Sequence, residues 1–170
     1  RVDLLFWFAG TSLLGMWFTF RDPVIDHRLI IFGALLPDLI DSVKGKQWIA
    51  HTLLFPVGIL FLVMLLTFGR RASRRRLLAL PIGLFWHLVF DASWTNPNIF
   101  WWPVAGISFE DREILLVEGT LGQIVLLELS GVLCLIWLFN RFGLSDAQRR
   151  KKFVRTGRID RSITEARMKN

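Results

Sequence analysis

The sequence predicts an all-α membrane protein with several spanning helices, and two observations carry that prediction. Hydrophobic residues make up 53% of the 170 residues, including 8 Trp and 15 Phe. These residues gather in long apolar blocks, as membrane spans do, instead of alternating with the period of two that is typical of strands. The length suits a single domain. We therefore expect a polytopic helical protein and exclude an ordinary soluble domain.

Four apolar blocks predict four transmembrane helices, at residues 4–20, 51–68, 77–92 and 119–140. The first is at the short end for a hydrocarbon core about 30 Å thick. It ends at Arg21-Asp22-Pro23, because charge stops the apolar run and proline disfavours helix in the residue before it. The apolar stretch 29–36 is too short to cross and leads into Pro37, so a short re-entrant or half-buried helix is expected there.

Charge predicts the orientation of these helices. The loop 70–76 holds five arginines and no acid, and the tail from residue 141 holds ten basic and three acidic residues. The segments 21–46 and 110–118 together hold five basic and eight acidic residues. Since short Lys/Arg-rich segments stay in the cytoplasm, both basic segments and both termini are predicted to be cytoplasmic. The opposite ends of the helices then face outward.

The basic tail predicts a second unit, so the chain divides into a membrane domain at 1–144 and a cytoplasmic tail at 145–170. Ser145 and Gln148 have the spacing of a helix-capping box, which predicts an amphipathic basic helix. This helix is expected to lie along anionic headgroups or to dock to an acidic partner. Nucleic acid is not expected, because the charge lies where the topology requires it and Phe153 is the tail's one aromatic residue apart from Phe142 at its start.

The predicted topology places all three histidines and several carboxylates at the outward ends of their segments. His87 and Asp91 are four residues apart and Asp38 and Asp41 are three apart, spacings that put each pair on one helix face. Ionisable groups at such depth are candidates for function. Imidazole with carboxylate is the ligand set of zinc, with manganese possible and calcium disfavoured. One or two ions are expected from the groupings of Asp38, Asp41, His51, His87 and Asp91.

Three motifs also resemble a known family. Residues 33–41 read Gly-Ala-Leu-Leu-Pro-Asp-Leu-Ile-Asp, His51-Thr52 follows, and residues 86–91 read Trp-His-Leu-Val-Phe-Asp, with Trp102-Pro103 after them. This pattern is similar to that of membrane-bound metal-dependent hydrolases of the LexA-regulated inner-membrane type, and more distantly to zinc-dependent phospholipase C enzymes. The chain departs from the family at residues 46–50, Lys-Gln-Trp-Ile-Ala, where a second histidine and an Arg-Gly pair are usual.

The resemblance implies a metallohydrolase in a bacterial inner membrane that acts on phosphoester bonds of a lipid or lipid-linked substrate. In this interpretation the five residues named above hold the metal and His27 is a weaker sixth ligand. Catalytic roles fall to Asp41 and Arg28, with Arg28 or a nearby carboxylate steering the phosphate. The alternative is a non-catalytic subunit of a membrane complex, in which the same residues form a structural metal site or a polar network. An open coordination position favours the enzyme, and a closed site favours the subunit. A transporter is the third choice, since no repeat is evident.

Overall fold

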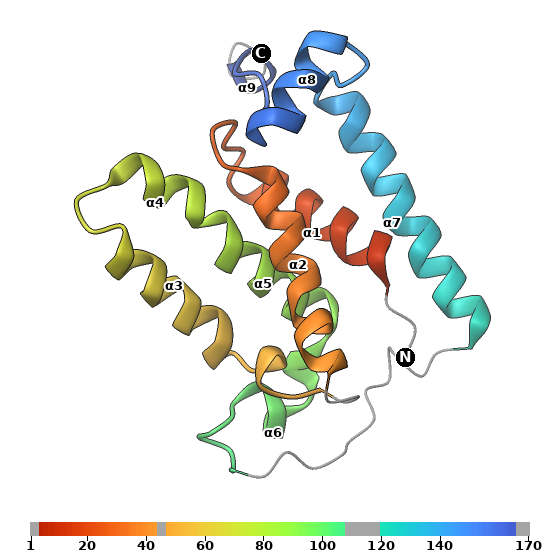
Figure 1. Ribbon diagram of the computed structural model, residues 1–170. Coiled ribbons are helices and arrows are strands. Elements are labelled where there is room, and N and C mark those ends of the chain that lie inside the picture. Colours follow the sequence, from red (N-terminus) through yellow and green to blue (C-terminus); the bar gives the residue numbers. More distant parts are fainter. Residues whose placement is uncertain (1–3, 44–46, 108–119, 166–170) are drawn as a thin grey trace.

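Every regular element in the described part of the chain is a helix in the computed structural model, which describes residues 4–43, 47–107 and 120–165 (Figure 1). No strand occurs in these residues, so the all-α prediction is confirmed. The loop 44–46 and the acidic residues Glu110, Asp111, Glu113 and Glu118 lie outside them. The elements are α1 Leu5–Thr19, α2 His27–Ser42, η1 Ile49–His51, α3 Leu54–Leu66, α4 Arg71–Leu77, α5 Ala79–Phe90, η2 Ser93–Thr95, α6 Pro97–Phe100, α7 Leu121–Arg141, α8 Ala147–Thr156 and α9 Ser162–Glu165.

Within the described ranges, α7 is the one helix long and apolar enough to cross a membrane. Its 21 residues span about 31 Å at 1.5 Å per residue. The prediction of four spanning helices is therefore wrong in number. The helices formed by the other three blocks, α1, α3 and α5, have 15, 13 and 12 residues.

Local sequence explains why these three helices are short. The residue after the first block, Arg21, has a positive φ of 47°, which ends α1. The second block loses its start, because His51 belongs to the 3-10 turn η1 and α3 begins only at Leu54. In the third block Pro81 has no N–H, and its ring crowds the carbonyl four residues earlier, at Leu77, where α4 ends. Apolar runs thus overstate helix length.

Helix α2 is longer than the short half-buried helix expected from the sequence, because it begins at His27 and continues through Pro37 to Ser42. Pro37 is buried inside the helix, and packing against α5 compensates for the cost of an interior proline. The two helices touch backbone to backbone at Gly33 and Gly83. A Cβ on Gly83 would collide with the backbone of Ile30, and one on Gly33 with the carbonyl of Leu80. Small residues permit such close approach.

The α2–α5 pair determines where the polar residues lie. Both helices run toward the same end of the bundle, where η1, η2 and α6 lie, and away from α4 and α8 (Figure 1). The carboxyl ends of α2 and α5 therefore meet beside η1. The other long pairing, α1 with α7, depends on Gly131, where a Cβ would meet the backbone of Phe6 and Trp7. Glu128 of α7 also accepts a hydrogen bond from the backbone N–H of Phe6 at 3.0 Å.

The basic tail forms the predicted helix, α8, capped by Asp146, whose side chain accepts hydrogen bonds from the N–H groups of Gln148 and Arg149. The tail packs against the start of α2. The Nδ1–H of His27 donates to the carbonyl of Gly157 at 2.9 Å, and Ile159 is buried in the core. That core cluster also includes Leu13, Met16, Trp17, Ile25, Ile30, Ala79, Leu138, Phe142 and Leu144.

A charged cluster joins α2, α4 and α8 at this end. Asp26 accepts hydrogen bonds from Arg28 at 2.8 Å and from Arg76 at 3.0 Å, and Asp22 pairs with Arg75 at 2.9 Å. Burial by itself raises the pKa of Asp26, but the bonds from Arg28 and Arg76 outweigh burial and lower it below its ordinary value. Asp22 and Asp26, which the charge pattern assigned to the outward surface, thus lie with the basic segment.

Replacing Arg28 with glutamine is expected to loosen the tail and leave metal content unchanged. The guanidinium of Arg28 also donates to the carbonyls of Val154 and Arg155 at 2.9 and 3.1 Å, so its loss frees the end of α8. Limited proteolysis should cut the R28Q tail several times faster than the wild-type tail, while elemental analysis gives equal metal. A fall in the metal content of R28Q would contradict this prediction and indicate that Arg28 contributes to the metal site.

Candidate metal centre

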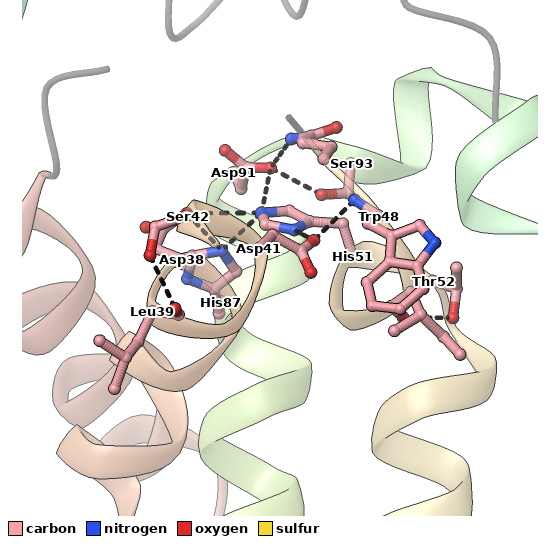
Figure 2. Close-up of polar contacts among 12 residues, drawn as sticks. Asp38, Leu39, Asp41, Ser42, Trp48, His51, Thr52, His87, Asp91 and Ser93 are labelled. Carbon is pink, nitrogen blue, oxygen red and sulfur yellow. Dashed lines mark hydrogen bonds and ion pairs between the residues drawn. The ribbon is translucent and has the colours of Figure 1, made fainter. Parts of the chain in front are cut away.

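Three elements bring histidines and carboxylates together at one end of the bundle. The last turn of α2 supplies Asp38 and Asp41, the short η1 supplies His51, and α5 ends with His87 and Asp91 (Figure 2). Asp91 is the C-cap residue of α5, and the left-handed Ala92 after it, with φ 55°, turns the chain into η2. His51 and His87 are fully buried, and the Asp38 side chain is 13% exposed.

Asp38, His51 and His87 form a group whose ligand atoms face one another. The two Nε2 atoms are 3.3 Å apart, and the Asp38 Oδ1 lies 3.5 Å from His51 Nε2 and 3.8 Å from His87 Nε2. Two ligands of a tetrahedral zinc ion at bond lengths of about 2.0–2.1 Å are about 3.3–3.4 Å apart. The three atoms are therefore within about 0.5 Å of the spacing that this geometry requires.

Hydrogen bonds to the other ring nitrogens fix the tautomer of both histidines. The Nδ1–H of His87 donates to the carbonyl of Ala34 at 2.6 Å, and a carbonyl can only accept. The Nδ1–H of His51 donates to Asp41 Oδ2 at 2.6 Å, an oxygen that also accepts from the N–H of Trp48 at 2.7 Å. In both neutral rings the Nε2 lone pair points into the group. Metal-binding histidines are oriented in this way by their second partners.

Two lone pairs that face each other across 3.3 Å need a cation between them, either a metal ion or a proton. Burial alone lowers the pKa of His51, but hydrogen bonds with Asp38 and Asp41 and the negative charge of Asp91 raise it to about 9. The metal-free group therefore holds a proton at neutral pH. The same carboxylates that stabilise this proton stabilise a divalent ion in its place.

Asp91 lies beside the group and is itself held in position. Its Oδ2 is 3.8 Å from His51 Nε2 and accepts hydrogen bonds from Ser93 Oγ at 2.7 Å and Gln47 Nε2 at 2.9 Å. On another side of the site Phe8 of α1 covers His87, with the ring centres 4.1 Å apart. Burial by apolar side chains and fixed carboxylates are both conditions that strengthen metal binding.

The structure separates the predicted site residues into two sets. Asp38, His51 and His87 face one another, with Asp91 adjacent, whereas Asp41 lies behind His51 and presents Oδ2 to its Nδ1. His27 and Arg28 are elsewhere, at the start of α2 beside α8 (Figure 1). The prediction that all three histidines lie at one end of the molecule is thus wrong for His27.

Sequence reasoning missed three contributors: Gln47, Ser93 and the carbonyl of Ala34. The backbone carbonyl carries no sequence signal. Gln47 does carry a sequence signal, since it falls in the stretch just before His51 that departs from the family pattern. Its side-chain Oε1 and the Oδ1 of Asp41 are buried without a hydrogen-bond partner among the described protein atoms. Buried polar atoms of this kind mark positions where a bound molecule or ion completes the site.

Replacing Asp41 with asparagine is expected to weaken zinc binding about tenfold, at the lower end of the 10–100-fold effect typical of a residue that orients a ligand. The amide oxygen can still accept a hydrogen bond from His51 Nδ1, but the negative charge that makes His51 Nε2 a stronger metal ligand is lost. Competition with a zinc chelator measures the change. Ser42→Ala is the matched control, since Ser42 on the same turn donates its hydrogen bond to the carbonyl of Leu39 and, among the described residues, not to the histidines. Equal affinities in D41N and wild type would contradict this role.

Comparisons with protein-family models, curated proteins and solved structures gave no match to this chain. A functional assignment therefore depends on the geometry of the Asp38, His51 and His87 group.

Proposed function

We propose that this protein is a membrane-bound, metal-dependent hydrolase whose metal is held by Asp38, His51 and His87. One observation carries the proposal: two buried histidines present Nε2 atoms 3.3 Å apart, with a carboxylate oxygen 3.5 Å away and both Nδ1 atoms already bonded. Zinc fits this nitrogen and oxygen donor set, and manganese is the second choice. Three protein ligands are the number found in catalytic zinc sites.

Each residue then has a role that its position supports. A zinc ion supplies Lewis-acid activation of water and of the bond to be cleaved. Asp38, His51 and His87 would hold that ion, and Asp41 positions His51, so we assign Asp41 to positioning and not to catalysis. Asp91, held by Gln47 and Ser93, is the carboxylate placed to accept a proton beside the group. Arg28 is too distant for the phosphate-steering role.

Membrane attachment is supported by apolar surface. Helix α7 is long enough to span a bilayer, and most of its side chains are exposed. Helix α3 exposes a further apolar face that includes Phe61, Leu65 and Leu66. Large contiguous apolar patches on a protein surface mark membrane or protein interfaces. The bundle end that carries α4 and α8 is basic, which places the metal group on the opposite, outward side in our proposal.

Phosphoester bonds are the substrate bonds that the family resemblance favours, so the first test is hydrolysis of a chromogenic phosphodiester by purified, zinc-loaded protein. We expect turnover that chelation abolishes and zinc restores. The His51→Asn variant should have none, while Leu62→Ala on the exposed face of α3 should keep the wild-type rate. Bound zinc without turnover on any phosphoester would overturn the hydrolase.

A second candidate function has its own supporting observation. The raised pKa of His51 and its contacts with the carboxylates of Asp38 and Asp41 describe a polar network in which a proton takes the place of the metal ion. Such a network suits a non-catalytic subunit of a membrane complex. Protein that binds no zinc at neutral pH, yet is destabilised by His51→Asn, would favour this candidate.

A further inference from the structure

A cavity beside Asp38 holds no assigned ligand. It has a volume of about 290 Å³ and lies between the start of α1 and the second half of α2. Among the residues that the structure describes, its walls are apolar apart from Asp38 and Ser42, and are otherwise formed by Leu4, Leu5, Phe32, Leu35, Leu36 and Leu39. We infer that this cavity binds a linear alkyl chain of the substrate, with the reacting group at Asp38. The inference rests on the proposed function, since it names the class of substrate.

Asp38 is the residue that connects the cavity to the metal group. Its Oδ1 is 3.5 Å from His51 Nε2, and the same side chain lines the cavity. Asp38 is also the most exposed member of the group, because both histidines are fully buried. Figure 2 shows Asp38 and Leu39 on the same side of His87, and both residues line the cavity. A ligand that reaches the group from this side brings its apolar part into the cavity.

The chemistry of the walls selects the ligand. Apart from Asp38, the six apolar residues and Ser42 add no charge to the cavity, and the Ser42 hydroxyl is already bonded to the carbonyl of Leu39 at 2.7 Å. A sugar or a nucleotide base would leave its polar groups unpaired there, whereas an alkyl chain would not. Methylenes are similar in size to a water molecule, which occupies about 30 Å³ in the liquid, so about ten fit into 290 Å³.

Competition by n-alkyl phosphates tests this inference. Protein in nanodiscs of phosphatidylethanolamine and phosphatidylglycerol is labelled with a decyl phosphate that carries a diazirine at its chain end, and labelled residues are mapped by mass spectrometry. Labels should fall on residues 4–5 and 32–39. The affinity of the competing n-alkyl phosphate should rise about fourfold with each added methylene and level off near ten carbons, where the cavity is full. Improvement that continues unchanged to sixteen carbons reports bilayer partition and overturns the inference, as do labels confined to α3.

Filling the cavity distinguishes it from the lipid-exposed surface. Leu36→Trp, or the smaller Leu35→Phe if the first is poorly folded, should shift the plateau to shorter chains by several methylenes. Leu62→Trp on α3 adds the same indole outside the cavity and should leave the plateau in place. The thermal unfolding midpoint reports whether each variant is folded. If competition levels off with chain length but the protein hydrolyses no phosphodiester, the alkyl-binding cavity is supported and the hydrolase proposal is wrong. If the protein hydrolyses the phosphodiester but competition does not level off, only the cavity inference is wrong.

Discussion

Replacing His87 with asparagine is expected to abolish zinc binding without unfolding the protein. The asparagine amide can still donate to the carbonyl of Ala34, as His87 Nδ1 does at 2.6 Å, but no atom replaces Nε2. One of three ligands is then missing, so affinity should fall by more than the 10–100-fold typical of residues that only orient a ligand. Elemental analysis of purified protein after equilibration with zinc measures the effect.

His27→Asn is the matched control for this experiment. The same substitution again preserves a donor, here to the carbonyl of Gly157, but it lies at the other end of α2. We expect H27N to keep one zinc and H87N to keep none. Equal loss in both variants would point to unfolding. Zinc retained by H87N, or zinc absent from the wild-type protein, would remove the metal centre altogether.

The contrast between His27 and His87 also shows how far the sequence could predict the site. The spacings of Asp38 with Asp41 and of His87 with Asp91 settle local geometry, because three or four residues make one helical turn. Expecting the two pairs to meet required only that both helices end at the same side of the bundle. The prediction failed for His27 because the charge pattern placed the whole segment 21–46 on the outward side. A continuous helix carries Asp38 eleven residues from His27, about 16 Å along the axis.

The length of the helices was less predictable than their existence. Hydropathy reports which residues avoid water, and it does so equally for residues in turns. His51 belongs to an apolar block by composition, yet it sits in a 3-10 turn whose direction aims Nε2 at His87. Likewise, the charge pattern placed Asp22 and Asp26 on the outward side. In the structure they form ion pairs with Arg75, Arg76 and Arg28 at the basic end of the bundle. Pairing between distant segments has no local signal.

The second large effect is expected at Gly83, where α5 meets α2. A Cβ there collides with the backbone of Ile30, which cannot rotate away as a flexible side chain would. Gly83→Ala should therefore push the two helices apart and destabilise the fold by about 1–3 kcal/mol, the usual cost of overpacking. Since Asp38 is on α2 and His87 on α5, the same displacement separates two ligands. Zinc affinity and the thermal unfolding midpoint should fall together.

Two other glycines separate these effects. Gly58 of α3 has open space at its Cβ, so Gly58→Ala should raise stability by as much as about 1 kcal/mol through helix propensity and leave zinc affinity unchanged. Gly131→Ala forces α7 away from α1, a pair that carries no proposed ligand, and should lower the unfolding midpoint without changing zinc affinity in the folded protein. If G131A weakens zinc binding as much as G83A does, the site depends on general stability and not on the α2–α5 contact. If G83A alone weakens it, the backbone contact between Gly33 and Gly83 is what sets the distance between Asp38 and His87.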